Sequence, residues 1–123
     1  LGHGVTIETG AGLSAGVRDA DYAAAGASLA ASPAETLTGA DAVLAVRTPE
    51  PAELAQIPRG AALVALLDPY AAKAEAAGWA DRGLLTVAME FVPRITRAQV
   101  MDVLSSQANL AGYRAVIEAA ELY

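Results

Sequence analysis

The chain has 123 residues, enough for one domain with a sizeable core and too few for two full domains. Hydrophobic residues make up 54% of it and charged residues 18%, which excludes an intrinsically disordered chain. The net charge of −6 argues against a nucleic-acid or anionic-membrane surface, the lack of Cys excludes disulfides and thiol catalysis, and the single histidine argues against a His-rich metal site.

Five short apolar runs, evenly spaced along the chain, predict β-strands. They span residues 5–7, 27–30, 42–46, 61–67 and 84–89. The last three are almost continuously apolar, which is typical of parallel strands covered on both faces. No apolar run approaches the roughly 18 residues of a membrane span, so we expect none in this chain.

Helix signals alternate with these runs. An N-cap residue, a first-turn proline or both mark the start of each predicted helix. These residues are Asp19, Ser32-Pro33, Pro51 and Asp68-Pro69. The helices that follow span 20–25, the residues just after Ser32, 51–56 and 70–77, and Gly26 and Gly78 are expected to end the first and the last of them.

The alternation of strands and helices predicts an α/β fold with an open, mainly parallel, flavodoxin-like sheet and helices on both faces. In the final third, apolar residues from Val100 to Ile117 recur at three- and four-residue spacings and predict a long C-terminal helix over about 98–121. The opening Leu1-Gly2 is typical of a helix end before the next strand. We therefore expect a single α/β lobe over 1–123, a piece of a longer protein that is incomplete at its N-terminus.

A glycine-rich turn follows the first predicted strand. A dinucleotide-binding turn has the pattern G-x-G-x-x-G, but after Gly10 and Gly12 the third glycine, Gly16, comes one residue late. The next predicted strand also ends without the carboxylate that such sites use. A plain turn is the favoured interpretation, and a dinucleotide site is the alternative.

Polar residues concentrate after the last predicted strand. The segment 90–99, with its loop at 93–99, carries two arginines, a threonine and a glutamine. Asp102, Ser105 and Asn109 follow at spacings that place them on one helix face. Ligands of parallel sheets bind beyond the carboxyl ends of the strands. This segment is therefore either a polar wall that faces a ligand or a solvated helix face with capping loops.

The same segment resembles proton-translocating NAD(P) transhydrogenase alpha subunits in their NAD-binding part. The resemblance rests on PRITRAQ at 93–99, MD at 101–102 and LSSQANLAGYRAV at 104–116, with ETGAG at 8–12, DADY at 19–22 and AGA at 25–27. It covers the whole chain, and alanine dehydrogenase shares the fold and the Gly10 region. The resemblance implies the first of two lobes, followed by a Rossmann domain that holds NAD, and an isolated chain that is inactive.

The resemblance also implies roles for individual residues. Arg94, Asp102 and Ser105 would orient the nicotinamide ring and its carboxamide, and Gln99 would reach towards an NADP-bearing partner domain. Arg94, Gln99 and Asp102 are thus the expected catalytic residues. The expected cofactor-binding set is Arg94, Ile95, Thr96, Arg97, Gln99, Asp102 and Ser105, and no metal is expected. Direct hydride transfer needs two nicotinamide rings at near-attack distance and no acid or base, which suits a chain without Cys and with one His.

The whole enzyme implied by the resemblance passes hydride from NADH to NADP, coupled to proton movement by membrane subunits. It would be a homodimer whose NAD-binding part lies peripherally at the cytoplasmic side of the membrane. An alanine-dehydrogenase-like lobe and a non-catalytic flavodoxin-like binding module are the alternatives. Alanine dehydrogenases hold pyruvate with a histidine and a lysine, whereas the corresponding strand ends here carry Asp68 and Arg47. An ionised Asp68 cannot donate to a keto acid, so this alternative is the weaker one.

Overall fold

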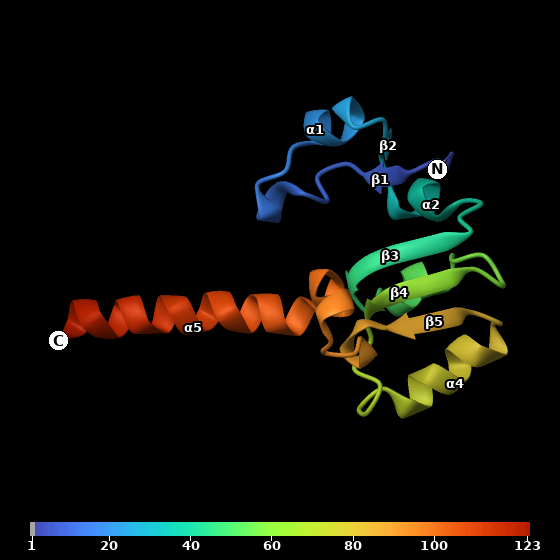
Figure 1. Ribbon diagram of the computed structural model, residues 1–123. Helices are drawn as coiled ribbons and strands as arrows, with labels where there is room; N and C mark the ends of the chain where they lie inside the picture. Colours follow the sequence, from blue (N-terminus) through green and yellow to red (C-terminus); the bar gives the residue numbers. More distant parts are fainter. Residues whose placement is uncertain (1) are drawn as a thin grey trace.

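The computed structural model describes residues 2–123 and, of Ser106, the backbone alone (Figure 1). Its strands are β1 (Thr6–Glu8), β2 (Ser28–Ala30), β3 (Ala42–Arg47), β4 (Ala62–Leu66) and β5 (Leu85–Ala88). Each one begins and ends within one residue of a predicted run, because each run is a short apolar segment between turn residues. All paired strands are parallel and alternate with helices, which confirms the predicted α/β fold with mainly parallel strand pairing.

The strands form two sheets rather than one. β1 pairs with β2, and β3, β4 and β5 form a second sheet with β4 in the centre. Within residues 2–123 no ladder joins the two sheets, so the predicted sheet is divided between them. The carboxyl ends of β3, β4 and β5 lie at one edge, and the chain leaves that edge towards its C-terminus (Figure 1).

The helical segments alternate with the strands as predicted. They are η1 (Leu13–Ala15), α1 (Asp19–Ala24), α2 (Pro33–Leu37), α3 (Pro51–Leu54), α4 (Lys73–Asp81), η2 (Met89–Phe91), η3 (Thr96–Met101) and α5 (Val103–Leu122). Ser32 caps α2 as expected, because its hydroxyl oxygen accepts from the N–H of Glu35 at 3.3 Å. The long C-terminal helix is confirmed, but it begins at Val103 because η3 occupies the residues before it.

Three local predictions are corrected. Asp19 is the first residue of α1 rather than its N-cap, and its carboxylate accepts from the N–H of Gly10 at 2.8 Å. Asp68 does not cap α4, which begins at Lys73, but lies in the loop after β4 with a φ of 45°. Gly78 does not end α4, because the helix continues to bury Trp79, whose burial outweighs the low helix propensity of glycine.

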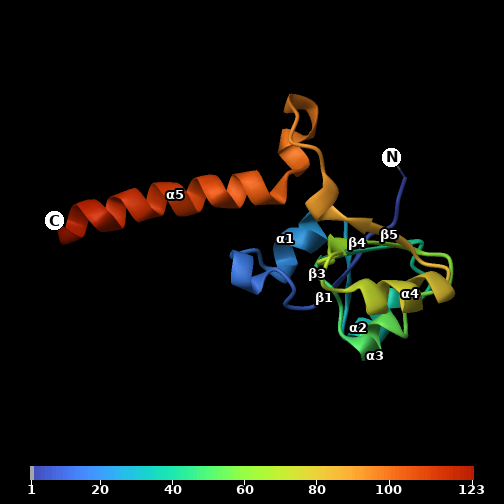
Figure 2. The same cartoon turned by 90° about the horizontal axis from the view of Figure 1, so that it is seen from below.

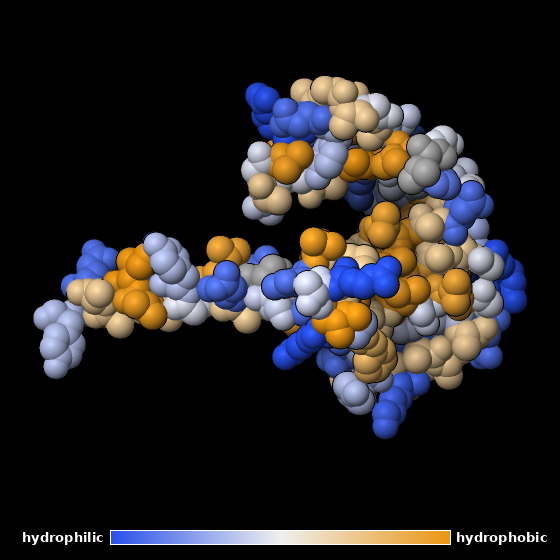
Figure 3. Space-filling model, viewed as in Figure 1, coloured by the Kyte–Doolittle hydropathy of each residue, from blue (hydrophilic) through white to orange (hydrophobic). Residues whose placement is uncertain are grey.

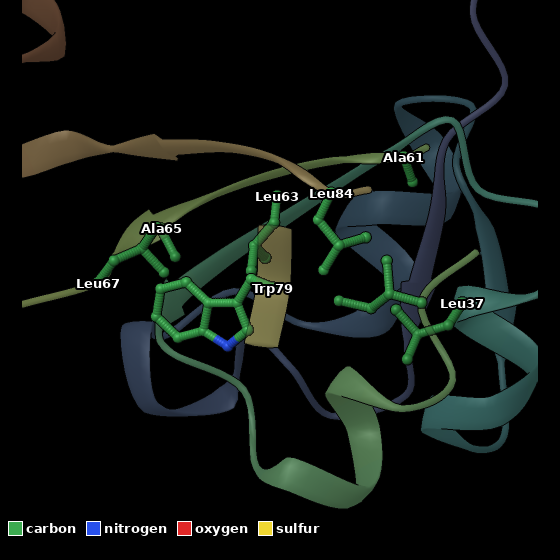
Figure 4. Packing of buried hydrophobic residues seen from close by; sticks show 8 residues of the cluster. Leu37, Ala61, Leu63, Ala65, Leu67, Trp79 and Leu84 are labelled. Carbon is green, nitrogen blue, oxygen red and sulfur yellow. The ribbon is translucent and has the colours of Figure 1, made fainter. Parts of the chain in front are cut away.

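The core lies on one face of the β3–β5 sheet. Leu63 and Ala65 of β4 have no exposed surface, and Leu37 of α2, Ile57 after α3 and Trp79 of α4 belong to the same buried cluster. Figure 4 shows the indole of Trp79 close to the residues of β4. Figure 2 shows α2, α3 and α4 on the same side of this sheet. The central strand β4 therefore supplies the most deeply buried side chains of this core.

The opposite face of the same sheet is largely exposed in the described chain. Side chains alternate along a strand, so Leu44 and Val46 of β3 point away from the core and are 81% and 80% exposed. Leu85 and Val87 of β5 are exposed as well. Figure 3 shows apolar surface over these strands and in the hollow between them and the β1–β2 pair. Within residues 2–123 the cover of this second face is therefore incomplete.

Candidate functional site

The predicted polar segment lies beyond the carboxyl end of β5. After Ala88 the chain forms η2, the loop that contains Arg94, η3, and then α5 (Figure 1). Backbone bonds shape this path, because Ile95 N–H donates to the carbonyl oxygen of Pro93 and Ala98 N–H donates to that of Ile95, each at 2.9 Å. Ala98 is the buried residue of η3, at 5% exposed.

Asp102 is the best-fixed residue of the site. It is only 6% exposed and is the N-cap of α5, where its Oδ1 accepts from the N–H groups of Leu104 and Ser105, both at 3.1 Å. Its Oδ2 accepts from the hydroxyl of Ser105 at 2.5 Å. The carboxylate therefore sets both the start of α5 and the rotamer of Ser105.

The charge of Asp102 is stabilised by the same contacts. The hydroxyl of Ser105, the N–H groups of Ser105 and Leu104, and the positive charge of Arg94 lower the pKa of this carboxyl, and together they outweigh burial, which raises it. Asp102 is therefore ionised at neutral pH and attracts the guanidinium of Arg94. This arrangement joins Asp102 to Ser105 by hydrogen bonds, and Arg94 lies near enough for its positive charge to act on the carboxylate.

The other predicted residues lie around this group on the surface. Ile95, Thr96, Arg97 and Gln99 are exposed, and the structure does not bring their side chains into the Asp102 group. The backbone of Gln99 is tied to the group, because its carbonyl oxygen accepts from the N–H of Asp102 at 3.3 Å. Exposed amide and guanidinium donors beside a fixed carboxylate can bind a polar ligand that approaches from solvent.

The sequence did not single out Glu90 as a site residue. Its carboxylate accepts from the backbone N–H of Asp68 at 2.7 Å and from that of Leu67 at 3.2 Å. Only its position directly after a predicted strand could have indicated a role, since its partners lie 22 and 23 residues earlier in the chain.

The glycine-rich turn has a structural explanation. Gly10 and Gly16 have φ values of 83° and 75°, which glycine adopts readily. A Cβ on Gly12 would lie 2.6 Å from the hydroxyl of Tyr22 and 2.7 Å from the carbonyl oxygen of Val17. Packing and backbone geometry therefore account for these glycines, which supports the interpretation as a plain turn.

Two other kinds of site are not found in the part of the chain that the structure describes. No three His, Cys, Asp or Glu side chains come together there in a group that could hold a metal ion. No helix in residues 2–123 is both long and apolar enough to cross a membrane.

Comparisons with known proteins match this chain to transhydrogenases and, at lower identity, to alanine dehydrogenases. The family model described as alanine dehydrogenase/PNT, N-terminal domain, matches residues 1–111. The chain is 52% identical to NAD(P) transhydrogenase subunit alpha of Cereibacter sphaeroides, over 97% of this chain and 23% of that protein. The crystal structure of a transhydrogenase from Sinorhizobium meliloti is 50% identical with a TM-score of 0.88, over all of this chain and 35% of that one. A solved L-alanine dehydrogenase is 33% identical with a TM-score of 0.70, over 79% of this chain and 26% of its own.

Proposed function

The chain belongs to the alanine dehydrogenase/PNT N-terminal domain family, and from that premise we propose that it is the nicotinamide-facing lobe of a proton-translocating NAD(P) transhydrogenase alpha subunit. The observation that carries the proposal is the Asp102–Ser105 pair beside Arg94 at the carboxyl end of the sheet. The higher identity to transhydrogenase than to alanine dehydrogenase also supports it. The chain spans 23% of the Cereibacter relative, so the activity belongs to a protein of that greater length.

The donor and acceptor pattern of the site fits a nicotinamide carboxamide, which offers one carbonyl acceptor and one amide donor. The hydrogen of the Ser105 hydroxyl is directed at Asp102, so the lone pairs of its oxygen are left to accept from an amide. The Arg94 guanidinium carries only donors and suits the carbonyl. Asp102 then acts by holding Ser105 and attracting Arg94, and it need not touch the ligand.

Bound NADH supplies the hydride, and the residues of this lobe supply orientation. Neither Arg94 nor Gln99 has to gain or lose a proton, because hydride transfer between two nicotinamides requires no acid or base. Gln99 is exposed and its carbonyl oxygen accepts from the N–H of Asp102, which supports a role for its side chain in reaching towards an NADP-bearing partner domain. A well-fixed geometry is the main contribution that such a site can make to the rate.

The proposal includes an assembly. The lobe works as a peripheral part on the cytoplasmic side of the membrane, in a homodimer, with membrane subunits that couple hydride transfer to proton movement. NAD(H) binds between this lobe and a Rossmann domain, and NADP binds to the partner domain or subunit. Similarity to proteins named as a subunit alpha supports the existence of other subunits.

The test separates the proposal from the two alternatives. The full-length protein with its partner subunits is given NADH and an oxidised NADP analogue whose reduction is followed by absorbance. In a parallel reaction it is given NADH, pyruvate and ammonium. Reduction of the analogue with no pyruvate-dependent oxidation of NADH is the expected result. Pyruvate-dependent oxidation would favour an alanine-dehydrogenase-like lobe, and inactivity in both reactions would favour a binding module.

A further inference from the structure

Glu90 connects two segments that are far apart in the sequence. It lies in η2, three residues before the loop 93–99, and both oxygens of its carboxylate accept from backbone N–H groups at the end of β4. The partner N–H groups belong to Leu67, which is buried, and to Asp68, which is held at a φ of 45° directly before Pro69. A non-glycine residue at that φ is strained and persists only where its surroundings hold it.

A second contact joins the same two segments. The rings of Tyr70, in the loop after β4, and Phe91, next to Glu90 in η2, meet edge to face with centroids 5.9 Å apart and an interplanar angle of 81°. This is a favourable geometry for an aromatic pair. η2 also contacts both β4 and α5, so it lies between the central strand and the helix that Asp102 caps.

The carboxylate of Glu90 is suited to holding backbone amides. Burial raises its pKa, but the N–H groups of Glu90 itself, Asp68 and Leu67 together outweigh burial and lower the pKa below its usual value. An ionised carboxylate makes shorter and stronger hydrogen bonds to N–H groups than a neutral acceptor does. Glu90 is thus a charged acceptor that fixes η2 to the end of β4.

We propose that Glu90 is a positioning residue for hydride transfer, because its bidentate hold on Leu67 and Asp68 fixes the point from which the Arg94 loop leaves the sheet. The inference rests on the proposed function of that loop. Arg94 follows η2 after only two residues, so a shift of η2 moves Arg94 relative to Asp102. Glu90 touches no ligand in this scheme and acts through the position of Arg94.

The kinetic test compares Glu90→Gln with Glu53→Gln in the full-length enzyme. Glu53 is a matched control, because it is also half-buried and its carboxylate also accepts from a backbone N–H, that of Glu50 at 3.0 Å, but in α3. An amide at position 90 keeps one acceptor oxygen and turns an N–H₂ group towards a backbone donor. A displacement of about 1 Å can cost on the order of 100-fold in rate, so the loss of one of the two bonds is expected to slow transfer by about tenfold.

The two variants are expected to differ in one quantity. Glu90→Gln slows transfer and leaves the Kd for NADH unchanged, whereas Glu53→Gln leaves both unchanged. Equal transfer rates in the two variants would overturn the proposal, and so would a loss in Glu90→Gln that follows its unfolding or its NADH affinity. Arg94→Ala is measured alongside: if Arg94→Ala slows transfer and Glu90→Gln does not, the function of the loop stands and the role of Glu90 fails.

An NMR measurement, which needs no turnover, also distinguishes a failure of the Glu90 proposal from a failure of the proposed function of the loop. In the 123-residue chain, backbone amide NMR signals of Arg94 and Gln99 are expected to move in Glu90→Gln and to stay in place in Glu53→Gln. Changes confined to Leu67 and Asp68 would overturn the positioning role, whatever the kinetics of Arg94→Ala. Movement at Arg94 together with an Arg94→Ala enzyme of normal rate would support the positioning of the loop and contradict the proposed function instead.

Discussion

Replacing Leu63 with Ala should destabilise the lobe severely. Leu63 lies in the central strand β4, has no exposed surface, and belongs to a cluster with Ile57 and Trp79. Truncation of a fully buried Leu costs about 3 kcal/mol of unfolding free energy, which lowers the urea midpoint by about 2 M at a slope of about 1.5 kcal/mol per M. Trp79 is the single tryptophan and is buried, so its fluorescence reports the transition.

Leu44→Ala is the matched control for this prediction. This variant makes the same Leu→Ala substitution on the neighbouring strand β3, but Leu44 is 81% exposed. Its truncation should change the unfolding free energy of the 123-residue chain by less than about 0.5 kcal/mol. Equal destabilisation by the two variants, or a Leu63→Ala midpoint equal to that of wild type, would refute the assignment of the core to one face of the β3–β5 sheet.

Three further predictions concern the site and its ligand. Ser105→Ala removes the largest contribution that lowers the pKa of Asp102, so a carbon-13 NMR titration should show the pKa of that carboxyl raised towards its usual value. Folding lowers the pKa of Asp102 and of Glu90, so their contribution to stability is present above the ordinary carboxyl pKa of about 4 and is lost as the pH falls through the lower folded values. Urea midpoints should therefore fall on acidification below about pH 4, and an Asp102→Asn variant should show a shallower fall. Calorimetric titration of the 123-residue chain with NADH should show no micromolar binding, because a dinucleotide also needs the glycine-rich turn and helix N-terminus of a Rossmann domain; micromolar affinity would contradict this and favour the Gly10 turn as a site.

The parts of the fold that depend on local sequence were predictable. The strands follow from short apolar runs, and the cap of α2 follows from Ser32 and Pro33, which act within one helical turn. That Asp102 and Ser105 lie close together was also predictable from their three-residue spacing. That Asp102 is the N-cap itself was not, because η3 displaces the start of α5 to Val103.

The remaining features depend on contacts between distant segments. Asp68 next to Pro69 has the sequence of a helix cap, but the carboxylate of Glu90 holds its backbone in a left-handed conformation instead. Gly78 is a typical helix stop, but Trp79 enters the core only if α4 continues. The hydrogen bonds from the backbone of Leu67 and Asp68 to Glu90 leave no pattern in the local sequence. The division of the strands into two sheets leaves none either.

The most direct test of the account is the rate of hydride transfer in Arg94→Ala and Gln99→Ala enzymes, measured by stopped flow, with Gln107→Ala as a control on the exposed surface of α5. Both site variants should slow transfer on the order of 100-fold. Their NADH affinity and unfolding midpoints should stay close to wild type, because the proposed function assigns most cofactor binding to a Rossmann domain and both side chains are exposed. Transfer rates near those of wild type and Gln107→Ala, or losses that follow unfolding, would contradict the assignment of hydride-transfer geometry to this loop.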